Sequence, residues 1–182
     1  MTLFPIRPGD FDRAEVEHPK LLDLLTFWEE RCGERAMPSR GDFDVLELAP
    51  WFGNLILLES AQPGGELVYR VYGTNLVRLL QHDRTNKTIT ELSSESRQDV
   101  MAEYATVLEW ARPLYVRQRR TVLKGQLLLS KLVLPLSDDG QNVDRILAGV
   151  YPSEEDMARD WPDRACGFVE TAEPIAAVAA VH

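Results

Sequence analysis

The sequence predicts an α+β fold, in which five antiparallel strands form one sheet, helices cover one of its faces, and a further helix flanks it at the N-terminus. Three observations support this prediction. Runs with the composition of strands come in one group of two and one group of three. Segments with apolar residues at helical spacing lie before and between these groups. The strands within each group are joined by short connections, which favour antiparallel pairing.

The first expected element is a helix from Pro19 to Cys32. Proline suits the first turn of a helix, where its missing N–H leaves no hydrogen bond unmade. The apolar stripe of this helix consists of Leu21, Leu22, Leu24, Leu25 and Trp28. Gly33 is a typical C-terminal stop. Because the leucine stripe needs cover, we expect the helix to pack on the sheet or on a second subunit.

A hairpin is expected after this helix. Residues 54–60 and 66–73 have the composition of strands, and a Gln-Pro-Gly-Gly sequence in the linker between them favours a turn. A short helix is expected over residues 74–81 because leucine and valine recur there at close spacing. Before the hairpin, Asp44 is followed three residues later by Glu47, and this spacing predicts a capping box at a short helical turn.

The longest helix is expected to begin at Ser96, where Asp99 completes a capping box. Pro113 disfavours helical conformation in the residue before it, so the helix ends nearby. The apolar positions between these ends are Val100, Met101, Tyr104, Val107, Leu108 and Ala111. A further capping box, between Thr88 and Glu91, indicates a short turn before this helix.

Three strands are expected to complete the sheet, over residues 114–123, 126–136 and 143–151. Lys124-Gly125 favours a turn in the first connection. Ser137-Asp138-Asp139-Gly140 favours a turn more strongly in the second, where the aspartates can bond to the backbone.

Composition limits the classes of function. The chain has 182 residues, of which 45% are hydrophobic, and a formal net charge of −9. Its length fits one domain over residues 42–151, with an N-terminal segment and flanking helix over 1–41 and a tail over 152–182. The acidic balance argues against binding to nucleic acid or to anionic membranes. With no signal-peptide core and no membrane span in the sequence, we expect a soluble, cytoplasmic protein.

Motifs for catalysis are largely missing from the sequence. It contains no nucleophile elbow, no P-loop and no dinucleotide fingerprint, and its two cysteines and three histidines do not cluster. His82 with Asp83 is the strongest candidate for acid–base chemistry or for an axial haem ligand. A catalyst needs a base and an orienting partner within hydrogen-bond reach, and the sequence supplies no convincing pair. No metal site is expected.

The strand over residues 114–123 has no purely apolar face. One face carries Gln118 and Arg120, and the other carries Arg117 and Arg119. If one face covers the core, its polar side chains form a pocket that binds a polar ligand. The alternative, which we favour because charged residues are seldom fully buried, is an edge or dimer-facing strand with solvated arginines. The local basic character of this strand suits an anionic ligand or an acidic partner.

Three stretches in this order resemble the bacterial single-domain PAS family found widely in alphaproteobacteria. They read HPKLLDLLTFWEERCGERAMPSRGDFD from His18, YRVYGTNLVRLL from Tyr69, and LVLPLSDDGQNVDRILAGV, which leads towards Tyr151. The resemblance implies a PAS-like sheet and a sensory or interaction module without catalysis. It also implies a small ligand or a signalling protein partner, and a homodimer formed through the flanking helix.

By this resemblance, we expect a cavity between the sheet and the helix that carries Tyr104. The candidate ligand-binding residues are Tyr69, Tyr72, Tyr104, Gln118, Arg120 and Ser130. The cofactor is unknown, and flavin–cysteinyl photochemistry is not expected because residues 75–81 contain no cysteine. Two alternatives remain: an enzyme that uses this cavity, and a ligand-free dimeric interaction scaffold.

Overall fold

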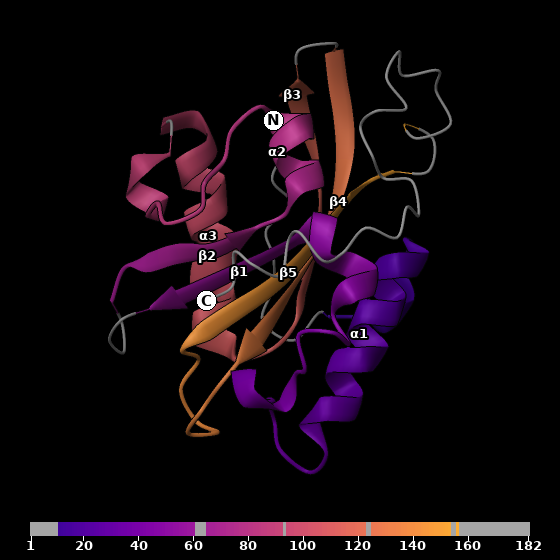
Figure 1. Ribbon diagram of the computed structural model, residues 1–182, viewed down its shortest axis with the longest axis vertical. Helices are drawn as coiled ribbons and strands as arrows, with labels where there is room; N and C mark the ends of the chain where they lie inside the picture. The colour runs from indigo at the N-terminus through magenta and orange to yellow at the C-terminus, as the bar shows by residue number, and fades with distance from the viewer. Residues whose placement is uncertain (1–10, 61–64, 93, 123–124, 154–155, 157–182) are drawn as a thin grey trace.

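A five-stranded antiparallel sheet forms the centre of the molecule, with strand order β2-β1-β5-β4-β3 (Figure 1). The computed structural model describes residues 11–60, 65–92, 94–122, 125–153 and 156. The strands are β1 (Leu55–Ser60), β2 (Leu67–Tyr72), β3 (Leu114–Val122), β4 (Gly125–Leu136) and β5 (Arg145–Pro152). The predicted α+β class and the antiparallel sheet are confirmed.

Three α-helices and four short 3-10 helices accompany the sheet. The α-helices are α1 (Pro19–Cys32), α2 (Thr74–Leu80) and α3 (Ser94–Trp110). The 3-10 helices are η1 (Arg13–Glu15), η2 (Arg40–Asp42), η3 (Ala49–Asn54) and η4 (Ile89–Glu91). The bounds of α1 are those predicted, and Gly33 after it has a positive φ of 58°, a backbone region that favours glycine.

The predicted start of the longest helix is wrong by two residues. It begins at Ser94 rather than at Ser96. The guanidinium of Arg97 donates two hydrogen bonds, of 2.6 and 3.2 Å, to the carbonyl of Leu92, and this fixes the chain just before Ser94. Asp99, the predicted capping partner, instead lies near a basic side chain of the sheet.

The other two predicted capping boxes have different outcomes. Thr88 and Glu91 form a capping box at η4, as expected. At Asp44 and Glu47 the chain forms successive turns rather than a helix, although the backbone N–H of Asp44 does donate to the Glu47 carboxylate at 3.3 Å. Three predicted features fall largely outside the described residues: the linker turn at 62–65, the turn at Lys124, and the tail over 152–182.

The central strands β4 and β5 are covered on both faces of the sheet. α1 packs against β4 and β5 on one face, whereas α2, η4 and α3 cover the other (Figure 1). Gly149 of β5 allows the close approach of α1, because a Cβ there would lie 2.7 Å from Leu21 and 2.8 Å from Leu24. The indole of Trp28 also donates to the carbonyl of Pro135 at 3.0 Å. The leucine stripe of α1 is therefore covered by the sheet of its own chain.

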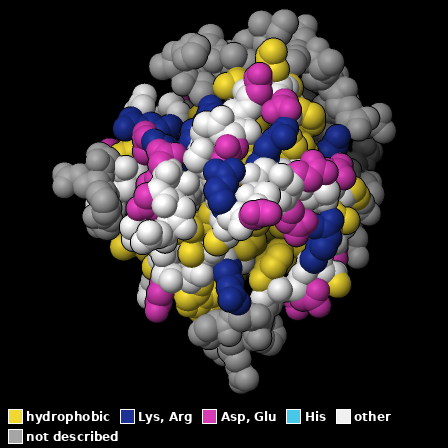
Figure 2. Space-filling view, turned by 90° about the horizontal axis from the view of Figure 1, so that it is seen from below, with side chains coloured by type: hydrophobic (Ala, Val, Ile, Leu, Met, Phe, Trp, Pro, Cys, Tyr) yellow, Lys and Arg dark blue, Asp and Glu magenta, His cyan; other side chains and the backbone are white. Residues whose placement is uncertain are grey.

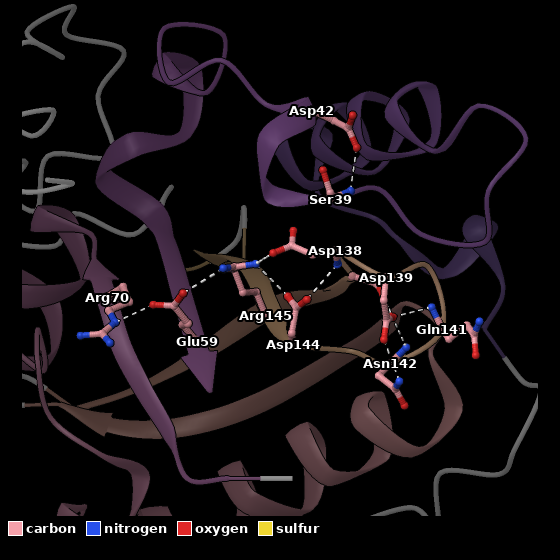
Figure 3. Close-up of polar contacts among 11 residues, drawn as sticks. Ser39, Asp42, Glu59, Arg70, Asp138, Asp139, Gln141, Asn142, Asp144 and Arg145 are labelled. Atoms are coloured by element: carbon pink, nitrogen blue, oxygen red, sulfur yellow. Dashed lines mark hydrogen bonds and ion pairs between the residues drawn. The ribbon is translucent and has the colours of Figure 1, made fainter. Parts of the chain in front are cut away.

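Polar side chains order the turn between β4 and β5 (Figure 3). Asp139 accepts hydrogen bonds from the side chain and N–H of Asn142 and from the N–H of Gln141, and these bonds hold the pKa of the Asp139 carboxyl well below its usual range. The predicted turn at Ser137-Asp138-Asp139-Gly140 is thus confirmed, and the Asp139 carboxylate bonds to backbone groups as expected, whereas that of Asp138 pairs with Arg145.

Arg145 ties this turn to the neighbouring strand (Figure 3). Its guanidinium lies 2.5 Å from Asp138, 3.0 Å from Asp144 and 3.0 Å from Glu59. Glu59 also pairs with Arg70 of β2 at 2.8 Å. Acidic and basic side chains are likewise interspersed over the face seen in Figure 2. Several acidic side chains are therefore neutralised by neighbouring arginines.

Candidate functional site

A cavity of about 230 Å³ lies between the sheet and α3, where the sequence predicts one. Its wall combines apolar, aromatic and basic side chains. The lining residues are Ile56, Tyr69, Tyr72, Leu80, His82, Arg84, Val100, Tyr104, Gln118, Arg120, Leu129, Lys131 and Val150. A single water needs roughly 10–15 Å³ of such space, so the cavity has room for several waters or for a small organic molecule.

Strand alternation determines which side chains reach the cavity. Successive residues of a strand point to opposite faces, so Gln118 and Arg120 of β3 share the cavity face with Leu129 and Lys131 of β4. On α3, residues four apart lie on one face of the helix, which brings Val100 and Tyr104 to the same wall.

The structure brings five of the six predicted site residues together at this cavity: Tyr69, Tyr72, Tyr104, Gln118 and Arg120. Ser130 lies apart from them, because it points to the α1 face of β4, whereas its neighbour Lys131 points into the cavity. Its hydroxyl is 3.1 Å from the hydroxyl of Tyr115. Ser130 shares its face of β4 with Leu132, Leu134 and Leu136, and this face packs beneath α1 rather than at the cavity.

A buried ion pair connects α3 to β4 beside the cavity. The ammonium of Lys131 lies 2.7 Å from Oε2 of Glu103, and the two side chains are 10% and 4% exposed. The ammonium also lies 4.3 Å from the ring centroid of Tyr104, a cation–π contact. The other carboxylate oxygen of Glu103, Oε1, is buried without a hydrogen-bond partner in the described part of the chain.

A second ion pair connects α3 to β3. Arg120 lies 3.5 Å from Asp99, with side chains that are 21% and 9% exposed. Arg117, on the opposite face of β3, is exposed and pairs with Glu17 at 2.8 Å. The interpretation of β3 as a strand with solvated arginines is therefore right for Arg117 and wrong for Arg120, because α3 covers only the face that carries Arg120.

Three tyrosines form the aromatic part of the wall. Burial raises the pKa of Tyr69, Tyr72 and Tyr104, so all three are neutral phenols at ordinary pH. Among the described residues, the Tyr104 hydroxyl has no partner of hydrogen-bonding geometry, although Tyr69 is close enough to offset part of the rise in its pKa. The guanidinium of Arg84 lies 5.9 Å from the ring centroid of Tyr72.

Sequence reasoning finds Arg120 but misses four other charged residues at this site: Arg84, Asp99, Glu103 and Lys131. One signal was available for Lys131, which is the single charged residue in a long apolar run of β4. Because both faces of such a strand are covered, a charge in it is buried and requires a partner. Nothing in the sequence identifies that partner, since Glu103 lies 28 residues away on α3.

Comparison with known families identifies the fold of this chain. A model described as a PAS domain matches residues 16–151. This match spans α1, the whole sheet up to Tyr151, and every lining residue of the cavity.

The chain belongs to the PAS-domain family. PAS domains are sensory modules, and the match includes the flanking helix α1 as well as the sheet. None of the curated proteins matches this chain.

Solved structures similar to this PAS domain include three sensory proteins or PAS domains. A light-oxygen-voltage domain studied with a flavin analogue is 15% identical, with 63% of this chain and 87% of that one covered and a TM-score of 0.47. A sensory box histidine kinase of Vibrio cholerae is 16% identical, with 59% and 87% covered and a TM-score of 0.44. A PAS domain of Colwellia psychrerythraea is 10% identical, with 62% and 99% covered and a TM-score of 0.43.

His82 and Asp83 do not form an acid–base pair in this PAS domain. Both are described residues, and no hydrogen bond joins their side chains. His82 is exposed at the cavity, and the Asp83 carboxylate accepts from the N–H of Thr85 at 2.9 Å. That bond holds the pKa of Asp83 below its usual value.

Two other kinds of site, a metal site and a reactive thiol, can be assessed for the described residues. No group of three His, Cys, Asp or Glu side chains is placed there to hold a metal ion. Cys32, the last residue of α1, is buried, and burial raises the pKa of its thiol to about 11. Among the described helices, none is long and apolar enough to cross a bilayer.

Proposed function

We propose that this PAS domain is a sensory module that binds a small molecule in the cavity between the sheet and α3 and signals to a protein partner. The observation that carries the proposal is a cavity of about 230 Å³ whose wall contains the hydroxyl of Tyr104, which has no hydrogen-bond partner among the described residues. The ligand contacts that we propose include the five predicted residues at this cavity, together with Lys131 and Arg84.

The polarity of the cavity favours a ligand over a filled or dry core. Cavities that stay dry in proteins are apolar, whereas polar ones hold water or a ligand. A buried polar group without a hydrogen-bond partner costs about 1–3 kcal/mol, and the Tyr104 hydroxyl is one such group. A polar molecule in the cavity would supply the missing hydrogen bond and offset this cost.

The two ion pairs link the wall of the cavity to α3. Lys131–Glu103 and Arg120–Asp99 both join α3 to the sheet, and Lys131 and Arg120 also line the cavity. A ligand that contacts either basic side chain competes with its carboxylate partner. We infer that ligand binding changes how α3 sits on the sheet and that a partner protein detects this change.

A homodimer remains a prediction, and the structure limits how it forms. The leucine stripe of α1 packs on the sheet of its own chain, with Leu21, Leu24 and Leu25 fully buried. We therefore propose that any dimer uses a different surface of the molecule.

Native mass spectrometry of protein purified from its own host tests the proposed function. We expect a mass above that of the 182-residue chain, which reverts to the chain mass when the ion is activated. The substitution Val100→Phe fills the cavity and should abolish the extra mass. Val71→Phe, on the other face of the sheet, should retain it.

A measurement of folding and an alternative variant complete this test. Circular dichroism establishes that both variants are folded, and Leu129→Phe, at another lining position, replaces Val100→Phe if the latter is not. A chain mass without any retained molecule would contradict ligand binding and favour the ligand-free scaffold. Retention in the cavity-filling variant would show that the molecule binds elsewhere.

A further inference from the structure

We infer that the ligand is a small organic monocarboxylate, whose carboxylate lies among the basic side chains of the cavity and whose body contacts the apolar wall. This inference rests on the proposed function and adds the chemical class of the molecule. Three independent features of the cavity lead to it: the sign of its charges, their number, and the placement of its polar and apolar groups.

The first feature is the sign of the charges on the wall. Arg84, Arg120 and Lys131 line the cavity, and none of the described lining residues is Asp or Glu. The two nearby carboxylates, Asp99 and Glu103, pair with Arg120 and Lys131 rather than forming the wall. A cationic ligand would meet like charges here, whereas an anion meets hydrogen-bond donors of opposite charge.

The second feature is the number of charges. Lys131 is neutralised by Glu103 and Arg120 by Asp99, which leaves the charge of Arg84. Within the described part of the chain, Arg84 forms no ion pair, and its guanidinium lies over the ring of Tyr72. Among the Lys and Arg side chains that line the cavity, one positive charge is therefore left without a carboxylate partner in the described residues, and a monoanion balances it.

The third feature is the placement of polar and apolar groups. The Tyr104 hydroxyl is buried, neutral and without a hydrogen-bond partner in the described part of the chain, so it can donate to a carboxylate oxygen. Ile56, Val100, Leu129 and Val150 form the apolar part of the wall. The volume of about 230 Å³ is below the ~300–1,000 Å³ of pockets for drug-sized ligands, so the molecule is small.

Calorimetric titration with matched acids and amides tests this assignment. The probes are benzoate with benzamide and butyrate with butyramide, pairs of similar shape that differ in charge, together with inorganic phosphate as a polyanion. We expect at least one carboxylate to bind about tenfold or more tightly than its amide, the ratio that a charge-assisted hydrogen bond provides.

Two substitutions locate the binding site of the carboxylate. Arg84→Gln removes the unpaired charge and should weaken binding of the carboxylate about tenfold while leaving its amide unaffected. Arg119→Gln is the matched control, because it removes the same charge from an exposed position on the cavity-distal face of β3. It should leave the affinity unchanged.

The outcomes separate this inference from the proposed function. Equal affinities for acid and amide, no binding of any carboxylate, tighter binding of phosphate, or wild-type affinity in Arg84→Gln would each overturn the monocarboxylate assignment. A neutral molecule retained in native mass spectrometry would also overturn it while supporting the proposed sensory function. A retained organic acid of single charge would support both.

Discussion

The buried ion pair between Glu103 and Lys131 permits a sharp test of the forces at this site. Glu103→Gln preserves the shape of the side chain but removes its charge. The ammonium of Lys131, whose side chain is 10% exposed, then loses the carboxylate at 2.7 Å. Because the ammonium cannot regain full hydration at that position, the folded state is destabilised relative to the unfolded one.

The magnitude follows from the geometry. Removal of one partner from a buried pair costs about 3–5 kcal/mol. The Tyr104 ring remains 4.3 Å from the ammonium of Lys131 and retains part of its stabilisation, so we expect the lower end, about 3 kcal/mol. For a domain of this size 1 kcal/mol shifts Tm by about 2–4 °C, which corresponds to a decrease of about 6–12 °C.

Urea denaturation at pH 7, followed by tryptophan fluorescence, measures the free energy of unfolding. An unchanged m-value shows that the loss reflects stability rather than a change in the extent of unfolding. The control is Glu17→Gln, which removes the same charge from the exposed pair with Arg117 and should cost less than about 1 kcal/mol. The double substitution Glu103→Leu with Lys131→Met should restore stability to near or above that of the wild type.

Two results would refute this reasoning. If Glu103→Gln destabilises the protein no more than Glu17→Gln, the pair with Lys131 is well hydrated and not part of a buried site. If the double substitution is as unstable as the single one, an unpaired charge is not the cause of the loss.

Three further predictions concern packing, reactivity and pH. Gly73→Ala places a Cβ 2.3 Å from the carbonyl oxygen of Gly53, so thermal unfolding should show a loss of about 1–3 kcal/mol, and an unchanged Tm would contradict the contact. In a Cys166→Ser variant, Cys32, with its pKa of about 11, should not react with a thiol reagent at pH 8 until the chain unfolds. The depressed pKa of Asp139 contributes stability above its unfolded pKa of 3.8, which is lost as pH falls through the folded value. Asp139→Asn should therefore flatten the decline in urea midpoint below about pH 5, and a parallel decline would count against this contribution.

The elements that sequence predicts best are those in which several local signals agree. For α1, the first-turn proline, the leucine stripe and Gly33 all lie within the segment or next to it, and both ends of the helix are as expected. The start of α3 depends instead on the hydrogen bonds from Arg97 to Leu92, which no capping pattern indicates. The antiparallel pairing of β1 with β2, of β3 with β4 and of β4 with β5 follows from their short connections, whereas no such connection indicates that β1 pairs with β5.

The site was only partly predictable because β4 is buried on both faces. Alternation separates Ser130 from Lys131, but it does not say which face meets α1 and which meets α3. Ser130 is the polar member of an otherwise apolar face of β4, and that face lies beneath α1. A charged residue within a strand that is covered on both sides is the better indicator of a polar cavity.

The free-energy cost of burying these charges raises the question of what the charges do at the cavity. Well-packed apolar residues in place of a buried ion pair are often neutral or stabilising by about 1–4 kcal/mol. Lys131 and Glu103 therefore do not need to be charged for the PAS domain to be stable, and the same holds for Arg120 and Asp99. Both pairs connect α3 to the sheet at the wall of the same cavity. Their position is explained if the basic members bind a ligand and the acidic members transmit its presence to α3.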